Sequence, residues 1–204
     1  MSNIYIIVIL LASITVHEFS HALAAYLLGD HTAKHEGRLT LNPLAHLDPI
    51  GTLAFFLLHF GWGKPVPVNE DNLKSGQFGY VLVSFAGPFS NFFLAFLAAL
   101  PLRYYIWQGI IPESNLISIL DITLFINLTL FIFNMLPIPP LDGFSIFSAI
   151  FSKYLKFYEK EKIYSAGIGI LIILIGLSYI NIDVFGFVFS KLLPPLRYLV
   201  FSIP

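Results

Sequence analysis

Long apolar runs dominate the hydropathy pattern of this 204-residue chain. A helix that crosses the hydrocarbon core of a bilayer needs about 20 predominantly apolar residues. Runs of roughly that length occupy residues 4–28, 80–102, 116–136 and 163–180. The pattern therefore predicts an all-α, multi-pass membrane protein with about four spanning helices.

Shorter segments lie between these runs. Residues 49–60 and 143–152 are apolar but too short to cross, so we expect them to be re-entrant or interfacial. Residues 38–42 (RLTLN) alternate polar and apolar side chains, and residues 64–68 (KPVPV) form a proline-spaced run. Both favour a small membrane-associated β-hairpin or sheet within residues 29–79, where the prolines allow only an edge strand. Such an edge could accept an extended substrate chain as a further strand.

The C-terminal apolar segment, residues 184–203, is interrupted by Pro194 and Pro195. Proline removes a helical hydrogen bond and kinks or breaks a helix. The segment also contains two basic residues, which favours a position at the membrane surface. We therefore expect a core of residues 1–182 followed by an interfacial tail, residues 183–204.

The composition supports a membrane protein independently. Hydrophobic residues make up 57% and charged residues 11% of the chain, and the mean hydropathy is +0.81. Soluble domains carry about 25% charged residues, so this chain lacks the polar surface to face water on all sides. The net charge of −1 gives no electrostatic basis for nucleic-acid binding. Because the chain has no cysteine, any metal must be held by His, Asp or Glu.

Basic residues are unevenly distributed along the chain. Residues 29–79 and residues 153–162 contain four lysines or arginines each, which makes eight of the eleven. Loops rich in Lys and Arg stay on the cytoplasmic side of a membrane. We therefore expect both segments in the cytoplasm, the N-terminus outside, and the protein in the cell membrane.

The first apolar run contains the sequence H-E-F-S-H at residues 17–21. Residues four apart share a helix face, so His17 and His21 offer two imidazoles to one metal ion. Glu18 is the only formally charged residue of the run, and it is placed to act as general base towards a water. Ionisable groups in membrane segments indicate function. We infer a metal-dependent hydrolase whose active centre lies in the membrane, nearer its cytoplasmic side.

A catalytic zinc usually takes three protein ligands, so two histidines leave one position to fill. The best candidate is Asp142, in N-M-L-P-I-P-P-L-D-G at 134–143. The prolines end the preceding helix, and irregular chain at membrane depth is tolerated only within protein or beside a wet cavity. The alternative is that Asp142 caps a helix beginning near Gly143. The H-E-x-x-H motif favours the ligand.

Three motifs occur in a fixed order: H-E-F-S-H at 17–21, A-G-P-F-S-N at 86–91, and the proline-rich aspartate motif at 134–143. With the stretches at 38–51 and 61–69, they resemble the site-2 protease family of intramembrane zinc metalloproteases, in its compact prokaryotic form. The resemblance implies peptide-bond hydrolysis in or next to the transmembrane segment of single-span substrate proteins, as in regulated intramembrane proteolysis. Since these residues show no PDZ-like or CBS-like segment, we expect the membrane core itself or a partner to select substrates.

The resemblance also implies a role for each site residue. One Zn²⁺ per chain would be held by His17, His21 and Asp142, with Glu18 as base and proton shuttle. Asn91 would face the zinc and help to hold the scissile carbonyl or its oxyanion. An interhelical hydrogen bond is the alternative role for Asn91, and the two roles are compatible.

Two other functions remain to be separated from proteolysis. A catalytically inactive membrane scaffold could retain the motifs, although the complete His/Glu/His/Asp set argues against it. A metal transporter would be expected to show internal repeats and polar groups along a through-path, whereas here the polar groups cluster at one depth. For His46, which lies in the family-like stretch 38–51, we expect a structural hydrogen bond to the backbone.

Overall fold

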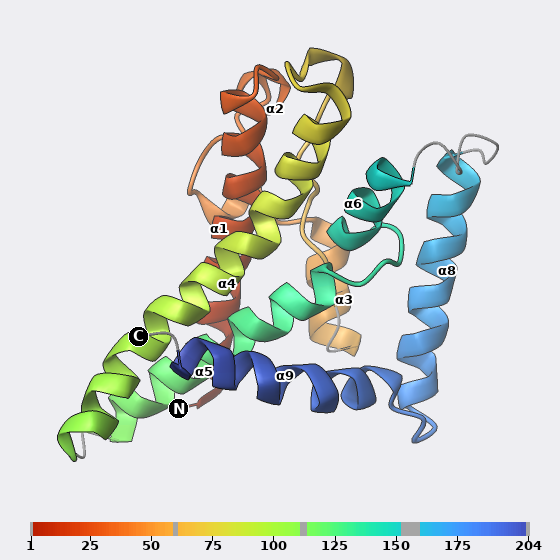
Figure 1. The fold of residues 1–204 in the computed structure, drawn as a ribbon. Coiled ribbons are helices and arrows are strands. Elements are labelled where there is room, and N and C mark those ends of the chain that lie inside the picture. The colour runs from red at the N-terminus through yellow and green to blue at the C-terminus, as the bar shows by residue number, and fades with distance from the viewer. Residues whose placement is uncertain (1, 59–60, 111–113, 152–159, 203–204) are drawn as a thin grey trace. The chain divides into compact units, whose positions relative to one another are not determined.

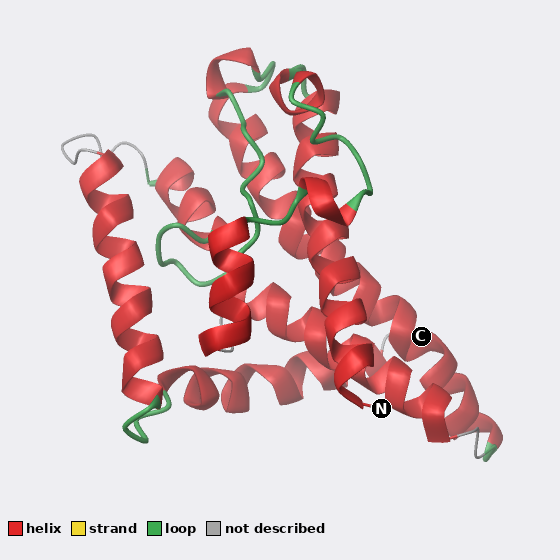
Figure 2. Ribbon diagram, turned by 180° about the vertical axis from the view of Figure 1, so that it is seen from behind, coloured by secondary structure: helices red, strands yellow, loops and turns green. Residues whose placement is uncertain are grey.

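The computed structural model of the chain describes residues 2–58, 61–110, 114–151 and 160–202. Its α-helices are α1 (Ser2–Leu27), α2 (Thr32–His35), α3 (Pro49–Leu58), α4 (Gly76–Gln108), α5 (Ser114–Asn134), α6 (Asp142–Ile150), α8 (Lys160–Ser178) and α9 (Val184–Ser202) (Figure 1). Two 3₁₀ turns, η1 (Pro43–Ala45) and η2 (Glu70–Asn72), lie in the long loop before α4. Figure 2 shows only helices and loops over this described part, so the all-α prediction is confirmed.

The chain divides into two units, residues 1–90 and 91–204, and α4 contributes residues to both. Among the described residues, four apolar stretches are long enough to cross a membrane: Ile4–Leu27, Gly76–Gln108, Asn115–Asn134 and Val184–Phe201. The first three confirm the first three predicted spans. Helices of this length and hydropathy make the chain a multi-pass membrane protein.

The C-terminal segment differs from its prediction. Pro194 and Pro195 lie inside α9, which continues from Val184 to Ser202. Membrane helices tolerate proline because neighbouring groups and local adjustments satisfy the freed carbonyl oxygens. Helix α9 also packs on α5, and Val200 is fully buried there. The prolines therefore do not interrupt the helix, and the interfacial placement of residues 183–204 stays a prediction.

The remaining predicted apolar segments are all helical. Most of the fourth predicted span, residues 163–180, belongs to α8, whose described apolar stretch is Ser165–Ser178 and is shorter than the four spans. The two short segments form α3, with ten residues, and α6, with nine. At the rise of a helix both are too short to cross a bilayer. Their re-entrant or interfacial placement stays a prediction.

The predicted β-hairpin or sheet in residues 29–79 is not formed. The described part of this loop contains no strand, and its β-pairing is an isolated antiparallel bridge between Leu47 and Gly63. Pro65 and Pro67 follow directly, and proline has no N–H with which to extend a ladder. The chain from residue 61 to residue 68, named here segment 61–68, therefore runs as irregular backbone.

Helix α1 ends in a turn that only glycine adopts without strain. Gly29 has a φ of +104°, and its N–H donates to the Tyr26 carbonyl while the Asp30 N–H donates to the Ala25 carbonyl. These two bonds form a Schellman motif, which ends the helix sharply. The turn places Asp30 directly after α1.

The Asp30 carboxylate ties the end of α1 to the loop before α4. It is fully buried and accepts hydrogen bonds from the backbone and hydroxyl of Thr32, the backbone N–H of Asn69 and the amide of Asn72. Burial alone raises the pKa of a carboxyl group, but here these hydrogen bonds to the charged form outweigh it. The pKa of Asp30 is therefore lowered from its ordinary value of 3.8.

In the second unit, α4, α5 and α9 share one core. The side chains that α4 contributes are mostly small, which lets helix backbones approach closely in membrane proteins. The buried members are Ala95, Ala98, Ala99, Leu102, Leu124, Leu128 and Val200.

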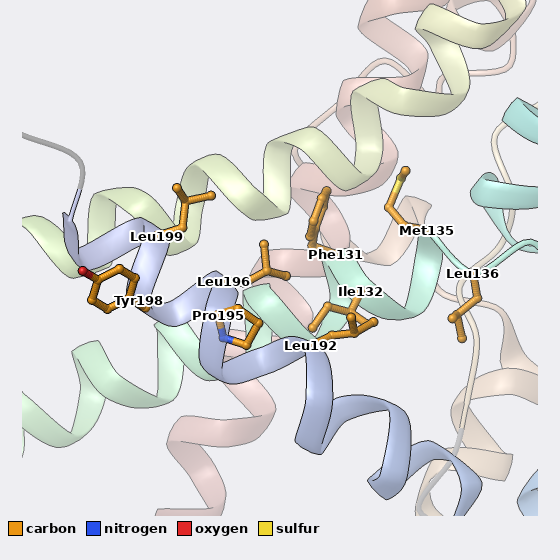
Figure 3. Close-up of a pocket in the computed structure, with 9 residues that line it drawn as sticks. All are labelled: Phe131, Ile132, Met135, Leu136, Leu192, Pro195, Leu196, Tyr198 and Leu199. Atoms are coloured by element: carbon orange, nitrogen blue, oxygen red, sulfur yellow. The ribbon is translucent and has the colours of Figure 1, made fainter.

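An open groove of about 560 Å³ lies between α5 and α9 (Figure 3). Its lining is almost entirely apolar and comes from Phe131, Ile132, Met135, Leu136, Leu192, Pro195, Leu196, Tyr198 and Leu199. These residues include no imidazole, carboxylate or thiol. The groove therefore offers neither a metal ligand nor a general base.

Candidate metal centre

The two histidines of the H-E-x-x-H motif converge on one point. His17 and His21 lie one turn apart on α1, and each is only 7% exposed. Their Nε2 atoms are 3.0 Å apart, and their rings meet edge to face. Two nitrogens bound to one tetrahedral zinc at about 2.0–2.1 Å would lie about 3.3 Å apart. The observed separation is close to that requirement, so the pair fits zinc.

The orientation of His21 is fixed from α4. Its Nδ1 atom lies 2.7 Å from the carbonyl oxygen of Val83, which can only accept a hydrogen bond. Nδ1 therefore carries the proton, which makes Nε2 the nitrogen that can bind a metal. A backbone carbonyl in this role holds the ring in place and raises the basicity of the ligating nitrogen.

Gly87 leaves the space in front of both imidazoles open. A Cβ built on this residue would lie 2.2 Å from Nε2 of His21 and 2.6 Å from Nε2 of His17. Those distances are nearly the bond lengths of zinc to imidazole nitrogen, so a side chain at residue 87 would occupy the place of the metal. The sequence alone indicates no role for Gly87, although it belongs to the A-G-P-F-S-N motif.

Glu18 follows His17 on α1 and is half-buried. Its Oε1 atom points towards Gly63, where an added Cβ would be 3.6 Å away. The first unit therefore holds the two imidazoles, Gly87 and the candidate base Glu18. A carboxylate beside a two-histidine metal site is the arrangement of metal-assisted hydrolysis.

Asp142 belongs to the second unit, where it is the first residue of α6. The cap position is taken by Leu141, which makes no side-chain capping bond, so the alternative in which Asp142 caps the helix is wrong. A Cβ on Gly143 would lie 2.3 Å from the Met135 carbonyl oxygen. The missing side chain thus lets the start of α6 pack against the chain that leaves α5, and this close packing positions Asp142.

Asn91 also belongs to the second unit and is fully buried. Its amide Nδ2 donates to Oδ1 of Asn127 on α5 at 3.0 Å, and Asn127 in turn donates to the Thr123 carbonyl at 2.9 Å. The predicted interhelical hydrogen bond is confirmed. A side-chain amide has two N–H groups and an acceptor oxygen, so this bond is compatible with a further role. The role of Asn91 towards substrate stays a prediction.

The other described histidines, His31, His35 and His46, make contacts of their own. His31 and His35 are exposed at the ends of α2. His46 is buried, and its Nε2 atom lies 2.7 Å from the Thr40 carbonyl oxygen, which confirms the predicted backbone contact. His59 lies outside the described residues.

Apolar spanning helices and a buried imidazole pair together define a multi-pass membrane protein with a metal centre on its helices. Sequence comparison gives the family. The signature of Peptidase family M50 matches residues 101–176, which include the proline-rich aspartate motif but not H-E-x-x-H. The chain belongs to Peptidase family M50, the site-2 protease family, and the predicted class of zinc metalloprotease is confirmed.

Relatives support the same assignment. "Putative zinc metalloprotease YwhC" of Bacillus subtilis is 46% identical over 146 residues, which are 70% of this chain and 67% of the relative. "Putative zinc metalloprotease Rip2" of Mycobacterium tuberculosis is 32% identical over 66% of this chain and 52% of its own length. The protein of the same name in Mycolicibacterium smegmatis is 35% identical over 70% of this chain and 56% of its own length. The match thus spans about half of each mycobacterial relative. No solved structure matches this chain significantly.

Proposed function

We propose that this protein is an intramembrane zinc metalloendopeptidase that cuts single-span membrane proteins in or next to their transmembrane segment. The observation that carries the proposal is the pair of Nε2 atoms of the buried His17 and His21, which face Gly87. The tautomer of His21 is fixed by its contact with the Val83 carbonyl oxygen. Asp142 supplies the third ligand. Its support is its place in the proline-rich motif, as the first residue of α6 rather than its cap.

Each residue has a distinct task in hydrolysis. His17, His21 and Asp142 would hold a zinc ion, which would supply Lewis acidity towards the scissile carbonyl and a water near neutral pH. Glu18 accepts the proton that the attacking water releases, and returns it to the amine nitrogen as the C–N bond breaks. Asn91 donates from its side-chain amide to the carbonyl oxygen as negative charge develops there.

The substrate main chain docks along segment 61–68, beside Glu18. The carbonyl oxygens of Lys64 and Pro65 are already bonded within the protein. By contrast, neither the N–H nor the C=O of Val66 has a hydrogen-bond partner among the described residues. Unpaired backbone groups of this kind are what an unwound substrate can bond by β-augmentation. A substrate helix must unwind first, because its own hydrogen bonds shield its carbonyl groups.

The membrane orientation follows from the basic residues. Residues 29–79 and 153–162 lie on the same side whether α8 crosses the membrane or not, because α1, α4 and α5 all precede the second segment. Loops rich in Lys and Arg are cytoplasmic. The N-terminus is therefore outside, and the released product enters the cytoplasm.

The decisive experiment compares wild type with Glu18→Gln in proteoliposomes that contain a panel of single-span substrates. Mass spectrometry should find products with wild type only, and a chelator should abolish them until zinc is added back. Both proteins should contain equal zinc, because Glu18 is not a ligand. Equal cleavage by Glu18→Gln contradicts the mechanism. Zinc content without cleavage would favour the scaffold, and zinc flux across the vesicle would favour the transporter.

A further inference from the structure

Arg38 is a buried cation held by uncharged partners. It is 3% exposed, and its NH1 and NH2 groups donate to the carbonyl oxygens of Pro65 at 2.9 Å and Lys64 at 2.5 Å. Among the described residues, these oxygens and one imidazole are its partners, and no carboxylate joins them. Burying a guanidinium is unfavourable unless its donors are satisfied, and within the described part of the chain Nε lacks a partner, so the cation depends on the bonds of NH1 and NH2. The two carbonyl groups are therefore held firmly in place.

His46 supports this arrangement from the other side. It is 1% exposed, and its Nε2 atom carries the proton because the Thr40 carbonyl oxygen that it contacts at 2.7 Å can only accept. In the neutral ring Nδ1 is then an acceptor, and it lies 3.4 Å from NH2 of Arg38. The main chain adds a second connection, since the Lys64 N–H donates to the His46 carbonyl oxygen at 2.8 Å.

The segment that these two residues hold lies next to the proposed general base. A Cβ added to Gly63 would be 3.2 Å from the His46 carbonyl oxygen, 3.5 Å from Cγ2 of Ile14 and 3.6 Å from Oε1 of Glu18. Segment 61–68 thus passes between His46 and the face of α1 that bears the motif. A shift of this segment would move the substrate's docking edge relative to Glu18, and small misplacements of a reacting group lower rates strongly.

We propose that Arg38 and His46 are positioning residues for proteolysis, which hold segment 61–68 beside Glu18 in the conformation that receives the substrate main chain. The inference rests on the proposed function and assigns the residues that prepare its docking edge. Holding segment 61–68 requires the planar guanidinium of Arg38, because its rigid group of donors contacts two carbonyl oxygens and the His46 ring at once. A lysine ammonium at the same place is a compact point charge without that geometry.

A first experiment measures the segment directly, without any cleavage. Since the chain has no cysteine, Val66→Cys introduces its only thiol. In that background Arg38→Lys should raise the rate of maleimide labelling about tenfold or more, because charge-assisted hydrogen bonds that restrain the segment are lost. His46→Gln is the second variant and should act in the same direction. Lys34→Gln, which removes an exposed cation from α2, should label like its parent.

A second experiment separates positioning from general support of the fold. With native residue 66 and a single-span substrate, Arg38→Lys should raise KM about tenfold while kcat changes less than about twofold. Zinc content should equal that of wild type, which shows that the imidazole pair is intact. Loss of kcat and zinc together with an unchanged KM would overturn the proposal.

The two experiments also distinguish a failure of the positioning role from a failure of the proposed proteolytic function, on which that role rests. If wild type cuts no substrate, the proposed function fails, but the difference in labelling between Arg38→Lys and its parent still appears. If wild type cuts and neither Arg38→Lys nor His46→Gln changes labelling or KM, the positioning role is wrong and the proposed function stands.

Discussion

Nδ1 of His21 lies 2.7 Å from the carbonyl oxygen of Val83, and this contact joins the metal-binding face of α1 to α4. One turn further along α4, Gly87 faces the Nε2 atoms of both His17 and His21. Helix α4 therefore fixes the tautomer of His21 through Val83, and at Gly87 it places no side chain in front of the Nε2 atom of His21.

Adding a methyl group in that space should prevent metal binding. Gly87→Ala would place its Cβ 2.2 Å from Nε2 of His21, so zinc affinity should fall by at least about 10- to 100-fold, the range known for changes in the surroundings of a metal ligand. Metal analysis of the purified protein measures the effect. Gly169→Ala in α8 is the matched control, because a Cβ there meets nothing within 4 Å. Full zinc occupancy in Gly87→Ala would contradict the site.

Gly143 offers an independent test of Asp142. In Gly143→Ala the new Cβ would lie 2.3 Å from the Met135 carbonyl oxygen, so the first turn of α6 must shift and move Asp142 with it. If Asp142 is a zinc ligand, zinc content and cleavage should fall together. Gly176→Ala, also open around its Cβ, serves as control. A Gly143→Ala protein that is folded, holds zinc and cuts normally would remove Asp142 from the ligand set.

The two roles of Asn91 can be separated through its partner. Asn91→Ala and Asn127→Ala each remove the same interhelical hydrogen bond, which is worth about 0.6 kcal/mol on average in membrane proteins. If Asn91 also holds the oxyanion, only Asn91→Ala should lower kcat, by about 10²- to 10³-fold. Single-turnover cleavage and thermal unfolding of both variants check this. Equal kcat values would leave Asn91 with the structural role alone.

Asp30 should make stability depend on acid pH. Its pKa is lowered in the folded state, because hydrogen bonds to the charged form outweigh burial, so its stabilisation is present above the unfolded value of 3.8. That stabilisation is lost as the pH falls through the folded value. At neutral pH Asp30→Asn should lower the free energy of unfolding by about 2 kcal/mol, since charge-assisted bonds are weakened.

Thermal unfolding in detergent above and below pH 3.8 measures this contribution. The difference between wild type and Asp30→Asn should shrink at the lower pH. Asp71→Asn, an exposed carboxylate on the same loop, is the control and should change little. A difference that stays constant with pH would show that the Asp30 charge does not stabilise the fold.

Several features could be predicted from sequence because they depend on local spacing or composition. The spans in α1, α4 and α5 follow from uninterrupted apolar runs, and the H-E-x-x-H spacing places His17 and His21 on one helix face whatever surrounds them. Family membership follows from motifs that lie in order along the chain. The continuity of α9 through its prolines could not be predicted, because the sequence shows the prolines but not the packing of α9 on α5.

Tertiary structure decided the rest, because contacts between distant residues have no local signal. The residues around Gly87 do not indicate that a Cβ at this position would clash with the imidazoles of His17 and His21 on α1. The buried position of Arg38 and its bonds to Lys64 and Pro65 likewise join residues more than twenty positions apart. The sequence determined which groups are available and that they lie on membrane helices. Only the packing of α1, α4 and the loop between them decided how the groups of the first unit face one another.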